Sequence, residues 1–195
     1  MYSNKQLEQA THKMGQTGIS ILNSIFWSTA LNGVATRSPN RKLELMLKTA
    51  MFVETGESSI EVQRFEKWFY NGVAPQRVCD AMLKITDYLS QVFPTPCKIR
   101  ALDIVPLYMT ASKAIYHGIS ADAFRSIVTE FLSFKRSVSA KVSKMPNKDI
   151  LQSYWINYTE ASKQGTNRQE KVDARIIAMW QFLFNVYKHM EDWRK

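Results

Sequence analysis

Lysine and arginine side chains concentrate between residues 131 and 148, a stretch without aspartate or glutamate. The basic residues of this segment are Lys135, Arg136, Lys141, Lys144 and Lys148. Cations grouped in this way bind phosphate oxygens, and several together hold a nucleic-acid backbone with little regard to base sequence. The segment therefore predicts a polyanion-binding surface, although a solvated face that only maintains solubility would have the same composition.

Two further groups of basic residues could extend this surface. One follows i, i+3, i+7 spacing, which places its members in a stripe along a helix; it consists of Arg168, Lys171 and Arg175. The other surrounds a Ser-Pro-Asn turn and consists of Arg37, Arg41 and Lys42. We predict phosphate contacts for the stripe as well as for the segment before Lys148, and a continuous surface if folding joins the groups.

The sequence contains no recognisable catalytic constellation. Its histidines, His12, His117 and His189, are far apart and fit none of the spacings that place two metal ligands on one helical face. His117 precedes a glycine at a predicted helix end, where an imidazolium interacts favourably with the helix dipole. Phosphate-binding glycine loops are missing, and so is the closely spaced Arg and His pair of the helical HEPN ribonucleases. We predict no enzymatic activity and no cofactor.

A divalent-metal site is the one alternative that the acidic residues leave open. Separate helices of a bundle could bring carboxylates together from Glu54, Glu57, Glu61, Glu66 and Asp80. Solvated helix faces are the commoner use of such residues. We therefore predict no metal.

Composition predicts one folded, basic domain over residues 1–195. The chain is 45% apolar and 12% aromatic, which supplies enough apolar area for a core, and its formal net charge is +9. Cys79 and Cys97 are too few for a disulfide framework and indicate reduced thiols. The N-terminal residues do not resemble a signal peptide, and no window is apolar enough for a membrane span. These features predict a soluble, cytoplasmic protein with no membrane contact.

Apolar residues recur at helical spacing along the chain, and strand signals are weak. Val78, Met82 and Ile85 belong to one apolar face, which predicts a helix from about Pro75 to Phe93. Prolines at 94 and 96 predict a break between two possible subdomains, near residues 94–97. Pro106 predicts a kink or a late start in the next helix, which ends at Tyr116. We predict an all-α bundle of eight or nine helices.

Capping signals predict where several other helices begin and end. A Ser58–Glu61 capping box opens a helix toward Tyr70, which Gly72 ends in the left-handed conformation. Asn147 caps a helix that ends near Gly165. A second box, at 167 and 170, precedes a long final helix. The basic segment itself continues an amphipathic helix as far as Lys144, where Pro146 follows.

Aromatic residues adjoin some of the charge and could stack on unpaired bases if they are exposed. They are Trp68, Phe69, Tyr70, Tyr154, Trp155 and Tyr158. Their spacing suits anchoring in a core equally, and that is the commoner use.

Three segments between residues 41 and 183 carry a resemblance: RKLELMLKTAMFVETGESS, LDIVPLYMTASKAIYHGIS and SYWINYTEASKQGTNRQEKVDARIIAMWQFL. Their shared features are Thr55-Gly56, Leu107-Tyr108 and a Tyr-x-x-Ala-x-x-x-Gly-Thr stretch from Tyr158. Together they resemble the helical region after the nuclease domain in ParB-like, GmrSD-type restriction proteins of bacteria, which act in defence against phage. That family's Asp-Gly-Gln-x-Arg motif and HNH segment are missing here. The resemblance implies a free-standing helical module that binds DNA or docks onto a nuclease partner.

These observations favour a non-enzymatic protein that binds DNA or RNA through the phosphate backbone, as an accessory of a prokaryotic or phage defence or counter-defence system. The alternative is an adaptor or assembly subunit, including a small helical subunit of a ribonucleoprotein complex. Its aromatic and methionine-rich surface would contact a protein partner or a second copy of the chain.

Overall fold

The computed structural model describes residues 3–32, 39–57, 62–97, 99–133, 148–163, 165 and 168–192. Within these ranges the chain forms nine α-helices and two short 3-10 segments, and no strand occurs in them. The helices are α1 (Asn4–Asn23), α2 (Ile25–Ser28), α3 (Pro39–Thr55), α4 (Val62–Tyr70), α5 (Gln76–Val92), α6 (Ile104–Tyr116), α7 (Ala121–Ser133), α8 (Lys148–Ala161) and α9 (Gln169–Asp192). The 3-10 segments are η1 (Ala30–Asn32) and η2 (Ala101–Asp103). The predicted all-α bundle is confirmed.

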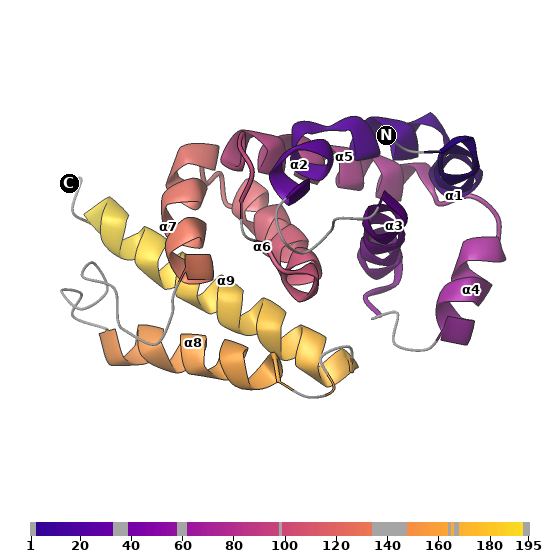
Figure 1. Ribbon diagram of the computed structural model, residues 1–195. Helices are drawn as coiled ribbons and strands as arrows, with labels where there is room; N and C mark the ends of the chain where they lie inside the picture. The colour runs from indigo at the N-terminus through magenta and orange to yellow at the C-terminus, as the bar shows by residue number, and fades with distance from the viewer. Residues whose placement is uncertain are drawn as a thin grey trace.

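The helices gather in two groups that share α5 and α6 as their junction. Helices α1 to α4 lie at one end of the molecule, and α7 to α9 lie at the other (Figure 1). Helices α8 and α9 run side by side in opposite directions, and α6 packs across α9. None of the described helices combines the length and the apolar character needed to cross a bilayer.

Several predicted helix boundaries match the structure. Helix α5 ends at Val92, before the two prolines, as the sequence predicts. Pro106 is the third residue of α6, where its missing N–H costs no helical hydrogen bond, so the late start is confirmed and the kink is not needed. Gly72 has φ +68° after α4, the predicted left-handed conformation. The predicted caps at Ser58, Glu61, Asn147 and Asn167, and the predicted helix to Lys144, lie outside the described residues.

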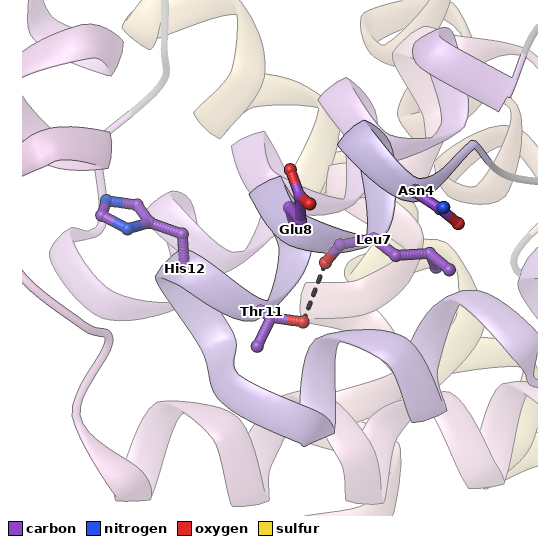
Figure 2. Close-up of a pocket in the computed structure, with 5 residues that line it drawn as sticks. All are labelled: Asn4, Leu7, Glu8, Thr11 and His12. Carbon is purple, nitrogen blue, oxygen red and sulfur yellow. Dashed lines mark hydrogen bonds between the residues drawn. The ribbon is translucent and has the colours of Figure 1, made fainter.

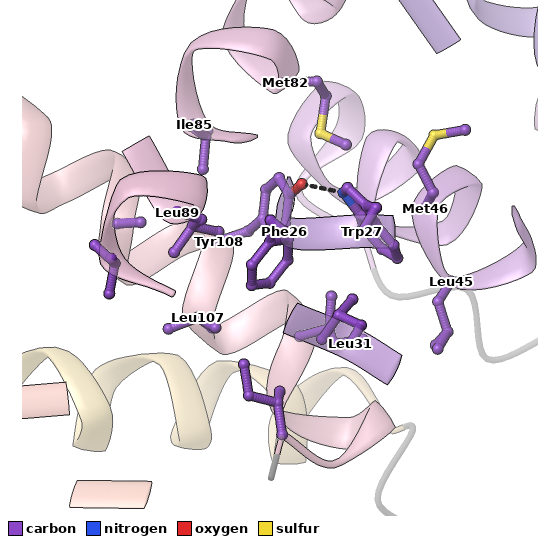
Figure 3. Packing of buried hydrophobic residues seen from close by; sticks show 14 of the residues in the cluster. Phe26, Trp27, Leu31, Leu45, Met46, Met82, Ile85, Leu89, Leu107 and Tyr108 are labelled. Carbon is purple, nitrogen blue, oxygen red and sulfur yellow. Dashed lines mark hydrogen bonds between the residues drawn. The ribbon is translucent and has the colours of Figure 1, made fainter. Parts of the chain in front are cut away.

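The core is mainly apolar, and a buried hydroxyl network lies within it. Tyr108 lies in the middle of it, completely buried, beside Phe26 and Trp27 (Figure 3). Its hydroxyl accepts a hydrogen bond from Trp27 Nε1 at 2.5 Å and lies 2.7 Å from Thr86 Oγ1. These contacts satisfy the polar atoms that burial removes from water. They join α2, α5 and α6.

One cluster of buried residues spans both sides of residues 94–97, from Ala10 in α1 to Val186 in α9. Polar contacts cross the same boundary. The guanidinium of Arg125 in α7 donates from Nε to the carbonyl of Val92 at 2.7 Å, and the amide of Cys97 donates to the carbonyl of Ala30 at 3.0 Å. The two groups of helices are therefore packed on a shared core.

Helix α1 contains a kink at Gly15, whose φ of 57° and ψ of −153° are not helical. This region of backbone space is essentially reserved for glycine. The kink turns the chain so that both halves of α1 contribute to the core, with Ala10 and Met14 before it and Ile21 and Leu22 after it.

Candidate nucleic-acid interface

Four residues of the predicted basic segment, Lys135, Arg136, Lys141 and Lys144, lie outside the described residues. Lys148 is described: it is the exposed first residue of α8. Among the described residues, the basic segment is thus represented by Lys148 alone, at the start of α8.

The stripe predicted on α9 holds only in part. Arg168 is exposed and Lys171 is half-exposed at the start of the helix. Two carboxylates, Glu170 and Asp173, lie among them, and Asp173 accepts hydrogen bonds from the amide of Gln169 at 2.9 and 3.1 Å. Negative charges on the same turns of the helix weaken the attraction that the cations exert on a phosphate.

Arg175 differs from the prediction, because its side chain is 2% exposed. Helix α8 covers this side of α9, and Arg175 Nη1 donates to the carbonyl of Ala161 at 3.1 Å. Desolvation lowers the pKa of its guanidinium. Its Nε is buried and finds no hydrogen-bond partner among the described residues. A phosphate contact would require α8 to separate from α9, so Arg175 is corrected from a surface cation to a packing residue.

The predicted clusters do not form one surface where they can be placed. Lys148 begins α8 and Arg168 follows its end, so the two lie at opposite ends of the α8–α9 pair (Figure 1). Fourteen residues of helix separate them by about 21 Å. In the third cluster, Arg41 pairs with Glu44 at 2.8 Å and Lys42 is buried, while residue 37 lies outside the described ranges.

The structure instead brings together a set of residues that the sequence did not predict as a group. We call it the aromatic–lysine patch; it consists of Lys113, Tyr116 and His117 at the end of α6 and Trp180, Phe184 and Lys188 on α9. On α9 these residues are four apart, so they form one ridge along the helix. On α6 they occupy the last turn and the residue after it. The crossing of α6 over α9 places the two groups in contact.

The rings of the patch form a closed cluster, in which the His117 ring also lies 5.2 Å from that of Phe184. Trp180 stacks on Phe184 with ring centroids 5.0 Å apart, and His117 stacks on Trp180 at 5.3 Å. Lys188 Nζ lies 4.5 Å from the centre of the Phe184 ring, and Lys113 Nζ lies 5.7 Å from that of Trp180. Both contacts are within cation–π range. Each of the two rings that α9 contributes to the cluster therefore has an ammonium group within cation–π range.

The helical segments that carry the patch contain no acidic residue. Residues 104–117 and 176–189 include neither aspartate nor glutamate, whereas the start of α9 carries both. Lys113 and Lys188 are the exposed lysines of these segments. An anion approaching the patch therefore meets cations without a neighbouring carboxylate on the same helical segment.

The aromatic residues singled out from the sequence serve mainly as core. Trp68, Phe69 and Tyr158 are buried, Tyr154 and Trp155 are partly buried against the core, and Tyr70 is 74% exposed. Lys13 caps the C-terminal end of α4. Its buried ammonium group donates hydrogen bonds to the carbonyls of Trp68 and Gly72 at 2.6 and 3.0 Å. Burial lowers the pKa of Lys13.

A polar network at the start of α6 is also buried. The Asp103 carboxylate accepts hydrogen bonds from Tyr158 Oη at 2.5 Å and from Arg100 Nε and Nη2 at 2.8 and 2.9 Å. Burial, followed by the nearby Asp103 charge, raises the pKa of the Tyr158 hydroxyl. The network ties α8 to the start of α6, and its donors and acceptors are engaged with one another.

An open depression lies along the outer side of α1, lined by Asn4, Leu7, Glu8, Thr11 and His12 (Figure 2). Thr11 Oγ1 donates to the carbonyl of Leu7 at 2.8 Å, a contact internal to the helix. The Glu8 and His12 side chains point in different directions, and the His12 ring lies 5.4 Å from that of Phe69. These residues therefore do not converge on a common point where a substrate atom could react.

Three of the acidic residues considered as metal ligands have other partners; Asp80, for one, accepts a hydrogen bond from Gln76 Nε2 at 2.8 Å. Glu54 accepts a hydrogen bond from Trp68 Nε1 at 2.9 Å, and Glu57 pairs with Arg64 at 3.3 Å. Among the described residues, no three histidine, cysteine, aspartate or glutamate side chains gather in a group that could hold a metal ion.

The methionine-rich surface of the adaptor alternative does not occur in the described ranges. Five methionines are buried and one, Met109, is partly buried; the buried ones are Met14, Met46, Met51, Met82 and Met179. They fill the core instead.

No family model, curated protein or solved structure matches this chain. The resemblance to the GmrSD-type restriction proteins therefore stays a prediction.

Proposed function

We propose that the protein binds nucleic acid through the aromatic–lysine patch, with the basic segment before Lys148 as a second contact. The observation that carries the proposal is the cluster of three contacting rings flanked by Lys113 and Lys188, on helical segments without an acidic residue. Aromatic rings beside ammonium groups are the combination by which proteins hold nucleic acids without reading sequence. The formal net charge of +9 adds long-range attraction for a polyanion.

The lysines supply the phosphate contacts in this proposal. Each cation–π contact at an exposed site stabilises the fold by only about 0.5–1 kcal/mol, so either ammonium group can turn from its ring to a phosphate oxygen at small cost. Binding then releases condensed counterions, and the affinity falls steeply as salt rises.

Fluorescence anisotropy of a labelled single-stranded oligonucleotide at several salt concentrations tests the proposal. We expect saturable binding at about 50 mM salt, and a double variant, Lys113→Gln and Lys188→Gln, whose slope of log affinity against log salt is smaller by about 1.4. The matched control, Lys5→Gln and Lys67→Gln, removes the same charge from exposed positions on α1 and α4. Equal slopes for the two double variants, or no binding at low salt, would contradict the proposal.

The basic segment has its own test. Reversing Lys141, Lys144 and Lys148 to glutamate should weaken binding further at low salt if the segment contacts the backbone. Unchanged affinity would remove the segment from the interface and leave the patch alone. The resemblance of residues 41–183 adds the hypothesis that this binding serves a defence or counter-defence system, as an accessory to a nuclease.

A further inference from the structure

We infer that Tyr116 stacks on an unpaired base, so that the aromatic–lysine patch binds single strands in preference to duplexes. The inference rests on the proposed function and names the form of nucleic acid that the same site takes. Tyr116 is 86% exposed, more than any other large hydrophobic residue in the described ranges. It lies at the end of α6, beside the cluster of three contacting rings.

The other rings of the patch offer less free surface. Trp180 and Phe184 stack on each other, and His117 and the two ammonium groups occupy further positions over them. Among the rings of the described residues, Tyr116 contacts only that of His117, at 5.3 Å and 88°, which is an edge-to-face contact. That contact orients the two rings while most of the Tyr116 surface stays open. Tyr116 is therefore the ring of the patch on which a base can stack.

The backbone around Tyr116 does not oppose an approaching phosphate strongly. A helix C-terminus carries partial negative charge on its last carbonyls. Here the amide of His117 donates to the carbonyl of Lys113 at 3.0 Å, and the amide of Ile119 donates to that of Ala114 at 2.9 Å. The Lys113 ammonium adds a positive charge in the same turn. A strand can thus place a base on Tyr116 and its phosphates toward the lysines.

A duplex cannot make the same contact. Its bases are stacked on one another and paired, so a ring at a helix end reaches their faces only after a base has been extruded. A duplex can still offer phosphates to Lys113 and Lys188. The stacking contribution therefore separates single strands from duplexes, and the charge contribution does not.

The test compares wild type, Tyr116→Ala, Tyr116→Phe and the matched control Tyr70→Ala, an exposed tyrosine on α4. The ligands are a labelled oligothymidine, its duplex with oligoadenine, and an abasic strand of equal length. We expect Tyr116→Ala to weaken binding of oligothymidine roughly 5- to 150-fold, the range for loss of one stacked base, and to leave the duplex and the abasic strand within about twofold. Tyr116→Phe and Tyr70→Ala should bind oligothymidine like wild type.

Each outcome distinguishes the inference from the proposed function. Wild-type protein that binds the abasic strand as tightly as oligothymidine, or a Tyr116→Ala variant that loses duplex and single strand equally, overturns the stacking inference and leaves phosphate binding intact. The abasic comparison needs no variant, so it decides the matter even if Tyr116→Ala does not fold. Wild-type protein that binds none of the three ligands overturns the proposed function and the inference with it.

Discussion

Replacing Asp103 by alanine tests the buried network that joins the start of α6 to α8. The carboxylate is 2% exposed and accepts hydrogen bonds from Tyr158 Oη and from Arg100. Alanine leaves the Tyr158 hydroxyl buried without this acceptor. It also removes the negative charge that favours the buried cation of Arg175.

The two losses set the magnitude. A buried hydroxyl left without its partner costs about 1–3 kcal/mol, and the loss is larger when the partner is charged, as the Asp103 carboxylate is; losing the favourable charge near Arg175 adds to it. Arg100 is more than half exposed and is hydrated once Asp103 is removed, so its contribution to the loss of stability is small. We expect the free energy of unfolding to fall by about 3–4 kcal/mol. In a chain of this length, that lowers Tm by roughly 6–15 °C.

Urea unfolding followed by far-ultraviolet circular dichroism measures this loss. Asp122→Ala is the matched control. It removes an exposed aspartate of α7 that pairs with Arg125 of the same helix at 3.2 Å. That change should alter stability by less than about 0.5 kcal/mol. Tyr158→Phe, which keeps the Arg100 contact, should cost about 1–1.5 kcal/mol. If Asp103→Ala costs no more than Asp122→Ala, the network does not hold α8 as described.

Three further outcomes follow from the structure. Gly15→Ala should destabilise the protein by about 1–3 kcal/mol in the same urea assay, because alanine is strained at φ 57°, ψ −153°. An unchanged urea midpoint would mean that α1 is straight in solution. Arg175→Met should leave nucleic-acid affinity and its salt dependence unchanged, because the guanidinium is buried; a reduced salt slope would show that Arg175 reaches phosphates after all. Burial raises the pKa of the Tyr88, Tyr108 and Tyr158 hydroxyls above the ordinary 10, so the unfolded state loses these protons first and the free energy of unfolding falls as pH rises above about 10. Tyrosinate absorbance during an alkaline titration should show these groups ionising only as the protein unfolds, and ionisation before unfolding would refute their burial.

Much of the fold could be predicted because its signals are local. The apolar face of Val78, Met82 and Ile85 requires only that neighbouring turns of one helix pack on the same side, and α5 matches it. Pro106 determines where its own helix can begin, whatever the other helices do, so the late start of α6 could also be predicted. Which helix covers which face depends on contacts between distant segments. The i, i+7 spacing of Arg168 and Arg175 carries no such information, and α8 buries Arg175.

The same reasoning explains why the aromatic–lysine patch was missed. Charge was weighed by its density along the sequence, where Lys113 and Lys188 are isolated residues in apolar segments. Affinity for a polyanion depends on density in space and on the carboxylates that lie nearby. The burial of Arg175 and the partial exposure of Trp180 and Phe184 have one cause, since α9 packs on α8 with one side and meets the end of α6 with another. A signal was available in the four-residue spacing of Trp180, Phe184 and Lys188, which places an ammonium group and two rings on one side of a helix without any acidic residue between them.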